Sequence, residues 1–567
     1  MKAQPHRFLA IAVSAAVFAV GLSLSAGQAA AQPILVTCAN TNFGTVILDS
    51  QFASQVGRSG PLTFVVQGTC IVNLIIHLDD VTIRTDGSIP ATLTAADPSQ
   101  STIQIDGARR IVIDGLFANG FTVNGGTFGI NATRGGSANI RNCQVTGASN
   151  TGIISAYNST VSVDACSVTG NGTGVGNGTG VAAVNTAAVV ITNSIVSGNT
   201  GSGLVAARNS YLRVGQDQSG TVLVKPVTVS GNGLNGIAIT EGSAGTVVGG
   251  TVETSTSSNI FVGRASSGQI GLGTNNLTGG VTIQNGSSNG ITVEGGNATI
   301  AFNTITGNLA RGIVVSNGGS ARIGVTNTNN VFGANTISNN GTDGIGVFHS
   351  SGTFIGGNTI ATNTVFGINV GQGTASIVGG NTITGNGQTG VFVRAGSVLI
   401  GDPGFGPATT VNTISGNGGA PSAGNTGGVF AFQGANIQVD SAVISNNTGA
   451  AVQSFEAGVI ELRGTTAVTV PAAGTTTGAL IQFGSTFRMR DTASIVSGTS
   501  SGIQASNDTS VNIRDATVTV QGNGPGALGV GVLCFISAPM TASAATLTGN
   551  LTGVTGTVGS NSGCNVF

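Results

Sequence analysis

A hexapeptide recurs along this chain at a nearly constant interval, and this repeat limits the possible folds more than any other feature. NTITGN at Asn303 is followed by NTISNN at Asn335, NTIATN at Asn358, NTITGN at Asn381 and NTISGN at Asn412, at intervals of 32, 23, 23 and 31 residues. A unit this short cannot bury its own apolar side, whereas stacked copies bury a continuous core, so the repeat predicts a solenoid. Related hexapeptides begin at Cys143, Cys166, Ser194, Val227 and Ala442.

Each repeat contains three short segments with the composition of β-strands. In the repeat at Asn303, the aliphatic Ile305 is followed by Gly312-Ile313, which begins a second segment, and by Ile323-Gly324, which ends a third. Segments of about four or five residues that are rich in β-branched residues and bounded by Gly, Asn and Ser are typical of strands. A β-propeller is the competing fold, but its blades need about 40–45 residues and usually an aromatic signature, and the chain has no Trp.

We therefore predict an all-β parallel solenoid with three short strands per coil, about 18–20 coils and an N-terminal cap. The aliphatic residue at the third hexapeptide position should face the core in every coil. These residues are Val145, Val168, Val196, Val229, Ile305, Ile337, Ile360, Ile383, Ile414 and Ile444.

Asparagine occupies the sixth hexapeptide position in most coils. Asn tolerates the left-handed backbone conformation that a sharp corner needs, and stacked amides hydrogen-bond from coil to coil at the strand spacing of about 4.8 Å. We predict a structural Asn ladder here, in preference to a row of ligand-binding amides. Its members are Asn171, Asn199, Asn232, Asn308, Asn340, Asn363, Asn386, Asn417 and Asn447.

The Asn-x-Ile-x-x-Asn corners, the Gly-Ile and Gly-Val strand starts and the period resemble the right-handed parallel β-helix repeat family of the pectin-lyase-like superfamily. The resemblance covers about residues 70–530, and Gly68-Thr69-Cys70 and Ile105-Asp106-Gly107 look like the first coils of exported members. It implies a right-handed parallel β-helix. It leaves the activity open, because the superfamily includes lyases, hydrolases, epimerases and adhesins, and a fold does not determine a function.

The first residues have the layout of a secretory signal peptide. Lys2 and Arg7 precede an apolar run over 8–22, and Ala29-Ala30-Ala31 supplies small residues before a cleavage site at Gln32. A signal anchor is the alternative, but the run is shorter than the roughly 20 residues of a spanning helix. We expect a secreted, periplasmic or cell-surface protein without a transmembrane segment in the mature chain. The expected segments are a signal peptide (1–31), an N-terminal capping segment (32–69), the β-helix (70–530) and a C-terminal cap (531–567).

The six cysteines, an even number, fit an oxidising compartment. Cys38 and Cys70 flank residues 43–56, whose apolar positions fit a short amphipathic capping helix, and a disulfide between them would join that helix to the first coil.

The other four cysteines form two further near-neighbour pairs. Cys143 and Cys166 share one motif position in neighbouring coils, close enough for a disulfide or for a stacked reduced pair. Cys534 and Cys564 would hold the C-terminal end in place.

The low charge of the chain disfavours several partners. It contains 20 Asp and Glu and 19 Lys and Arg, for a net charge of −1, so neither a nucleic acid nor an anionic membrane surface meets a basic patch. No Cys-x-x-Cys pair or Gly-Gly-x-Gly-x-Asp repeat is present, and we expect no metal and no cofactor.

Four longer coils carry their extra residues after the glycine that ends the third strand, at 216–226, 273–280, 325–334 and 402–411. These insertions should project from one corner as a ridge, and loops on one face of a repeat protein commonly bind ligands. Tolerated variation of surface loops is the alternative. The candidate binding residues on this ridge are Asp217, Asn275, Asn276, Asn327, Asn329, Asp402 and Phe405.

Catalytic side chains are sparse. Glycoside hydrolysis needs two carboxylates at a defined separation, but the acids are scattered, and the sequence motifs of polygalacturonases and pectate lyases are absent. The candidate catalytic residues are Asp106, Asp114 and Asp164, although Asp106-Gly107 and Asp114-Gly115 are also typical turn dipeptides.

Aromatic platforms for sugar stacking would have to be built from Phe, because the chain has no Trp and two Tyr. We expect strand residues such as Phe348 and Phe392 to stack in the core. The sequence thus favours an exported, monomeric, non-enzymatic interaction or structural scaffold whose partner is a polysaccharide or a cell-surface component. The alternative is a carbohydrate-active enzyme, namely a polysaccharide lyase, hydrolase or epimerase.

Overall fold

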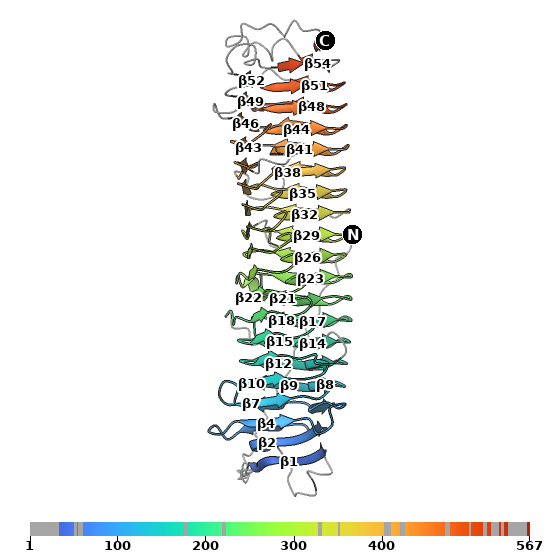
Figure 1. The fold of residues 1–567 in the computed structure, drawn as a ribbon, viewed down its shortest axis with the longest axis vertical. Helices are drawn as coiled ribbons and strands as arrows, with labels where there is room; N and C mark the ends of the chain where they lie inside the picture. Colours follow the sequence, from blue (N-terminus) through green and yellow to red (C-terminus); the bar gives the residue numbers. More distant parts are fainter. Residues whose placement is uncertain are drawn as a thin grey trace, which may run out of the picture.

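The computed structural model describes residues 33–49, 54, 61–174, 178–217, 223–326, 331–349, 352–401, 410–419, 426–470, 477–497, 501–513, 519–522, 532–534, 538–542 and 564–566. The predicted signal peptide lies outside these residues. The described chain is a rod of stacked coils that runs from β1 at one end to β54 at the other (Figure 1).

Two long strands begin the rod. β1 (Ile34–Leu48) pairs in parallel with β2 (Leu62–Ile76), and β2 pairs in succession with β3, β4 and β5 of the next coil. Each long strand therefore follows the outline of one whole coil. The described parts of the predicted capping segment are thus strands that continue the stack of coils.

From β3 onward each coil contributes one strand to each of three parallel sheets. The strands of the first sheet are β3 (Val81–Thr85), β6 (Ile111–Asp114), β9 (Ser137–Arg141), β12 (Thr160–Asp164), β15 (Ala188–Thr192), β18 (Tyr211–Val214), β21 (Ala244–Val247), β24 (Ser267–Ile270), β27 (Asn297–Ile300), β30 (Ser320–Ile323), β33 (Gly352–Ile355), β36 (Thr374–Ile377), β39 (Ser397–Ile400), β42 (Asn436–Asp440), β45 (Val459–Arg463), β48 (Thr486–Met489), β51 (Ser510–Ile513) and β54 (Ala538–Ala542).

The second sheet carries the hexapeptide repeats. Its strands are β4 (Ala91–Thr94), β7 (Phe121–Asn124), β10 (Cys143–Thr146), β13 (Ser167–Thr169), β16 (Ile195–Ser197), β19 (Thr228–Ser230), β22 (Thr251–Glu253), β25 (Thr282–Gln284), β28 (Thr304–Thr306), β31 (Thr336–Ser338), β34 (Thr359–Ala361), β37 (Thr382–Thr384), β40 (Asn412–Ser415), β43 (Ala442–Ser445), β46 (Ala467–Val470), β49 (Ser494–Ser497) and β52 (Thr519–Gly522).

The third sheet follows the Asn corner. Its strands are β5 (Ile103–Asp106), β8 (Phe128–Thr133), β11 (Thr151–Ala156), β14 (Val181–Val184), β17 (Leu204–Ala207), β20 (Ile237–Ile239), β23 (Ile260–Gly263), β26 (Ile291–Glu294), β29 (Ile313–Ser316), β32 (Ile345–Phe348), β35 (Ile368–Gly371), β38 (Thr389–Arg394), β41 (Gly427–Phe432), β44 (Val452–Phe455), β47 (Ala479–Ile481), β50 (Ile503–Ala505) and β53 (Val532–Cys534). A last strand, β55 (Cys564–Val566), pairs with β54.

The strands β3 to β50 make about 16 coils of three strands, compared with the 18–20 predicted, and the long strands β1 and β2 each follow the outline of one more coil. The core is the interior of the rod. Ile305, Ile337, Ile360, Ile383 and Ile414 pair in register from coil to coil and are completely buried. The aliphatic column of the hexapeptide therefore faces inward as predicted, and each such side chain stabilises the fold by about 1.5–3 kcal/mol.

The predicted Asn ladder is present. Nδ2 of Asn340 donates to Oδ1 of Asn363 at 2.9 Å, and Nδ2 of Asn363 donates to Oδ1 of Asn386 at 2.9 Å. The left-handed residue of the corner, however, is the one before the ladder residue, for example Thr362 (φ 54°) or Gly385 (φ 64°). The backbone of the ladder residue is not itself left-handed. Asn is therefore favoured at this position because its buried side-chain amide hydrogen-bonds to the neighbouring coils.

The ladder is interrupted where the sixth position holds Ser255 and Gly286. The side chain of Asn259 bridges this interruption. Its Nδ2 donates to Oδ1 of Asn308 at 3.0 Å, across the coil that contains Gly286. A side chain added at Gly286 would collide with Asn259, since its Cβ would lie 2.8 Å from Nδ2 of that residue. The missing ladder residue is therefore replaced by an amide from a different position.

A second ladder occupies the first hexapeptide position, which the sequence analysis did not assign. Nδ2 of Asn303 donates to Asn335 at 3.0 Å, and the series continues through Asn358 and Asn381 to Asn412. The sequence contains the evidence for this second ladder, because the same Asn is the first residue of the repeated hexapeptide.

Cys143 and Cys166 occupy the same column earlier in the chain. Both are buried free thiols, and Sγ of Cys166 accepts from the backbone N–H of Cys143 at 3.4 Å. The next coil fills this position with Ser194, whose Oγ accepts from the N–H of Cys166 at 3.1 Å. The reduced, stacked alternative is therefore the one observed, with sulfur in the place of the ladder amides.

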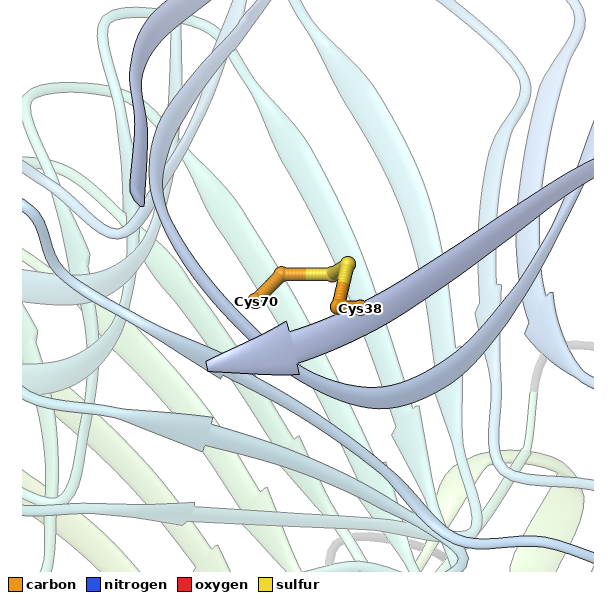
Figure 2. Close-up of a disulfide and its surroundings, with 2 residues drawn as sticks. All are labelled: Cys38 and Cys70. Carbon is orange, nitrogen blue, oxygen red and sulfur yellow. A yellow bond between two sulfur atoms is a disulfide. The ribbon is translucent and has the colours of Figure 1, made fainter. Parts of the chain in front are cut away.

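Cys38 and Cys70 form the predicted disulfide, which joins β1 to β2 with their Cα atoms 5.1 Å apart (Figure 2). The side chains of Cys534 and Cys564 lie outside the description, so their pairing stays a prediction.

The capping helix predicted over 43–56 is wrong for residues 43–48, which belong to β1. Ile47 is 49% exposed while Leu48 is 4% exposed, and this alternation of exposure is that of a strand at the open end of the stack. Of residues 50–60 the structure describes only Ser54.

Candidate functional site

The outer face of the first sheet carries a trough of about 570 Å³ that extends from β18 to β33. Its middle coils present short side chains, such as Ala244, Ser267 and Ser320, whereas Tyr211 lies at one end and Phe354 at the other. Small residues between large ones create the depression. The strands are in parallel register throughout, so the trough runs along the axis of the rod.

Two arginines lie in this part of the first sheet, namely Arg322, which lines the trough, and Arg213, which is on β18 beside the lining residue Tyr211. Arg213, Thr246, Gln269, Thr299 and Arg322 form one outward column in successive coils, so the arginine Cα atoms are about 19 Å apart, four strand spacings.

Neither arginine has a carboxylate within 4 Å among the described residues. The Arg213 guanidinium lies 5.5 Å from the centre of the Tyr211 ring and donates to the carbonyl oxygen of Asp217 at 3.2 Å. The Arg322 guanidinium lies 5.8 Å from the centre of the Phe354 ring, and its Nε is buried without a hydrogen-bond partner. The two charges are therefore positioned by aromatic rings and neutral groups.

The predicted ridge of insertions borders this trough. Oε1 of the buried Gln216 accepts from the N–H of Thr274 at 3.1 Å, and its Nε2 donates to the Thr274 carbonyl at 3.3 Å, which ties two insertions together. Thr274 begins the short 3₁₀ helix η1 (Thr274–Asn276) and lines the trough. The insertion that contains Thr274 thus lies beside the candidate site and is joined to the one that contains Gln216.

The predicted ridge residues have different surroundings. Asp217 forms an ion pair with Lys225 at 2.8 Å, and this hydrogen bond raises the pKa of Lys225. Asn275 is exposed with a left-handed backbone (φ 60°), and Asn276 follows it in η1. Asn327, Asn329, Asp402 and Phe405 lie outside the described residues.

The candidate catalytic acids lie apart from one another, and each already forms a hydrogen bond or an ion pair within the protein. Asp106 ends β5 in the third sheet, whereas Asp114 and Asp164 lie in the first sheet with Arg141 between them in register. Oδ1 of Asp164 accepts from Oγ1 of Thr192 at 2.7 Å.

Asp114 is the turn residue that its dipeptide indicates. Its Oδ1 accepts from the N–H of Leu116 at 2.8 Å, and its Oδ2 lies 2.9 Å from Nε of Arg141. Asp106 pairs with Arg134 at 3.0 Å and lies 3.6 Å from Nδ1 of His77, while its Oδ1 is buried without a partner. The structure does not bring the three acids together into one constellation.

The expectation that Phe348 and Phe392 stack in the core is confirmed in part, because Phe392 is buried and stacks on Phe366, whereas Phe348 is only partly buried. Phe392 belongs to a separate aromatic cluster with Phe366 and Phe430, outside the continuous core to which its neighbours Val391 and Val393 belong. The Phe348 ring lies 4.8 Å from the Arg311 guanidinium. Alternation along β32 and β38 directs these rings to the outer face of the third sheet.

The described residues were searched for groups of metal-ligating side chains and for membrane-spanning helices. No three His, Cys, Asp or Glu side chains gather there in a group able to hold a metal ion. No helix in the same residues is long and apolar enough to cross a bilayer.

Three parallel sheets with ladder-lined corners define a β-helix protein. The family model described as the right handed beta helix region matches residues 91–252 and 270–419, more than half of the chain, and the chain belongs to this family.

Three solved structures are similar in fold. A chain of the Vag8–C1 inhibitor complex is 12% identical, covers 89% of this chain and 99% of its own length, and has a TM-score of 0.48. The periplasmic alginate epimerase AlgG is 12% identical, with 76% and 85% covered and a TM-score of 0.27. The A-module of the Azotobacter vinelandii mannuronan C-5 epimerase AlgE4 is 13% identical, with 87% and 93% covered and a TM-score of 0.25. No curated protein sequence matches the chain.

Proposed function

We propose that this protein is an exported, non-enzymatic scaffold that binds an acidic polysaccharide along the trough of the first sheet. The observation that carries the proposal is the pair of guanidinium groups, Arg213 and Arg322, that lack carboxylate partners among the described residues although the chain has as many acids as bases. A carboxylate or sulfate on a sugar supplies the missing partner, and charge-assisted hydrogen bonds to such groups are strong and directional.

The shape of the trough supports an extended ligand. It is open along the rod axis, and between the two arginines it offers the hydroxyl and amide side chains of Thr246, Gln269 and Asn297. Hydroxyl and amide groups suit the hydrogen bonds of sugar hydroxyls, while Tyr211 and Phe354 provide aromatic surfaces for the faces of sugar rings.

Export is supported by the signal-peptide pattern and by the Cys38–Cys70 disulfide, which is the type of bond that persists in oxidising compartments. A non-enzymatic role is supported by the trough lining, because its described residues include no Asp, Glu or His. Cleavage of glycosidic bonds by general acid and base catalysis uses a pair of carboxylates.

The proposal is tested by binding of the mature protein to a tetrasaccharide of galacturonic acid, measured by isothermal titration calorimetry. Replacing Arg213 and Arg322 with Gln should remove two charge-assisted hydrogen bonds of about 1.5–3 kcal/mol each, which weakens the trough site by at least a hundredfold. Arg208→Gln is the matched control, because Arg208 is exposed and paired with Glu241 at 3.4 Å. Unchanged binding by the double variant refutes the proposal.

The alternative is a carbohydrate-active enzyme that uses Asp114 and Asp164. The observation in its favour is the register that places these acids on either side of Arg141 in consecutive coils of the first sheet. Combined Asp106→Ala, Asp114→Ala and Asp164→Ala substitutions would abolish any sugar release that these carboxylates catalyse. Retained release by that variant removes the assignment.

A further inference from the structure

The outward face of the second sheet carries a regular array of hydroxyl groups. In β28, β31, β34, β37 and β40 a buried Ile stands between two outward side chains, and the strands pair in parallel register. The residue before the Ile is Thr in all five strands, and the residue after it is Thr, Ser or Ala. We name these two columns the threonine face, and its first column is Thr304, Thr336, Thr359, Thr382 and Thr413.

The uniformity of the threonine face exceeds what strand formation requires. Thr is favoured in strands, but so are Val, Ile, Tyr and Phe, and the outward positions of the other two sheets are mixed. In the first sheet Arg322 lies beside Phe354, and in the third sheet Asn369 lies beside Phe392. The outward positions of β28 to β40 in the second sheet hold only Thr, Ser and Ala, so this face has no charge and no aromatic ring.

The two Asn ladders lie along the borders of the threonine face. One ladder, from Asn303 to Asn412, runs along the start of the five strands. The other, from Asn308 to Asn417, runs along the corner that follows them. Neighbouring strands of a sheet usually rotate by about 20–25°, and flat sheets are typically held by stacking or by side-chain ladders.

The strands accordingly stay nearly parallel from coil to coil (Figure 1). The first column of the face is also accessible, since its Thr is exposed in β28, β31, β34 and β37. β-Branching restricts the χ1 angle of Thr, which favours one orientation of the hydroxyl group in every coil. The array is therefore ordered before any ligand binds, which lowers the entropic cost of binding.

The spacings of the array define the ligand that it fits. Equivalent side chains are about 4.8 Å apart along the rod and about 6.7 Å apart across the strand, and each spacing lies within about a tenth of an oxygen repeat on the prism face of ordinary ice. The hydroxyl groups donate and accept hydrogen bonds with water. The methyl groups between them restrict the orientation of the first shell of water.

An ordered lattice of water fits the threonine face better than a sugar or a protein does. Sugar rings are usually bound on aromatic side chains, and the face has none. The cores of protein interfaces are enriched in aromatic residues, Met and Arg, and the face lacks these as well. A flat, uncharged surface of hydroxyl and methyl groups at a regular spacing meets the requirements of an ice surface.

We propose that the threonine face binds ice, and that its hydroxyl and methyl groups hold water molecules at positions of the ice lattice. Protein bound in this way prevents water from joining the covered part of the crystal, so it should slow the growth of ice. The face belongs to the second sheet and uses none of the trough residues. The inference therefore does not rest on the proposed function.

The experiment grows an ice hemisphere slowly in a solution of the mature protein and measures the protein in the ice and in the liquid. Wild type should be enriched in the ice and should show thermal hysteresis in a nanolitre osmometer. Thr359→Lys places a long charged side chain in the middle of the face, so this variant should be excluded from the ice as serum albumin is. Because the Thr359 side chain is exposed, hydrogen exchange of β31 to β38 should stay that of wild type.

Thr160→Lys is the matched control, because Thr160 is an exposed Thr of β12 in the first sheet. It should be enriched in ice like wild type, and so should the trough double variant Arg213→Gln and Arg322→Gln. Exclusion of wild type from ice, or an equal loss in Thr359→Lys and Thr160→Lys, overturns the proposal. Exclusion from ice combined with binding to crystalline chitin or cellulose that Thr359→Lys abolishes overturns ice as the ligand.

Discussion

Replacing Asn363 with Ala in the middle of the Asn ladder should loosen the coils around it. Oδ1 of Asn363 accepts from the backbone N–H of Asn340 at 3.1 Å and from its Nδ2 at 2.9 Å. Nδ2 of Asn363 donates to Oδ1 of Asn386 at 2.9 Å and to the Ile337 carbonyl at 3.2 Å. Alanine leaves two N–H groups of Asn340 buried without a partner, namely the backbone N–H and the one on Nδ2 that does not donate to the Ile305 carbonyl. Each orphan costs about 1–3 kcal/mol, so the expected loss is about 2–6 kcal/mol.

Hydrogen exchange measured by mass spectrometry is the suitable assay, because the coils of a solenoid contact only their neighbours and the effect should be local. Peptides from β31 to β38 should exchange faster in the variant, while peptides from β6 to β12 should not change. Asn436→Ala, at an exposed position of β42, is the matched control. Exchange in β31 to β38 that equals the control would refute the reasoning that the ladder amides stabilise the coils.

Three further predictions concern the ends and the thiols. Cys143 and Cys166 are both buried, and burial also raises the pKa of Cys143. Both thiols should therefore be inaccessible to iodoacetamide at pH 8 in the native protein and react after unfolding in urea, as counted by mass spectrometry. Hydrogen bonds from the N–H groups of Ser88 and Ile89 lower the pKa of Asp86 to about 2. Because this folded-state pKa is depressed, the stabilisation is present above about pH 4 and is lost as the pH falls toward 2. The free energy of unfolding of Asp86→Asn, measured by denaturation at each pH, should therefore change less with pH across that interval. Replacing Cys38 and Cys70, which are separated by 32 residues, with Ser should lower the free energy of unfolding by about 3–4 kcal/mol in urea titrations.

The sequence predicts the fold well because each coil repeats the same local rules. A β-branched residue at the third hexapeptide position and Asn at the sixth position are sufficient to set the inward column and the ladder, and both are confirmed at Ile337 and Asn340. The repeat also contains the second ladder, which begins at Asn303, the first residue of the hexapeptide.

The ends and faces of the rod were harder to predict. Residues 43–48 have apolar positions compatible with either a helix or a strand, and only pairing with β2 decides between them. Phe348 and Phe392 are apolar residues in strands, and the alternation that turns them outward depends on which neighbour faces the core.

The candidate trough depends on small residues, whose effect appears only when the coils are stacked. Ala244 and Ser267 follow Tyr211 in register in successive coils, although these residues are 33 and 23 positions apart in the sequence. The trough has no local motif, so it was not assigned from the sequence.

Binding of an acidic polysaccharide without cleavage can be measured in one experiment. The mature protein is incubated with a panel of acidic and neutral polysaccharides, and both retention of the protein and release of unsaturated or reducing sugars are measured. A non-enzymatic scaffold for acidic polysaccharides should be retained on acidic polymers and release no sugar. Release of sugars, or the absence of retention on every acidic polymer, would refute this function.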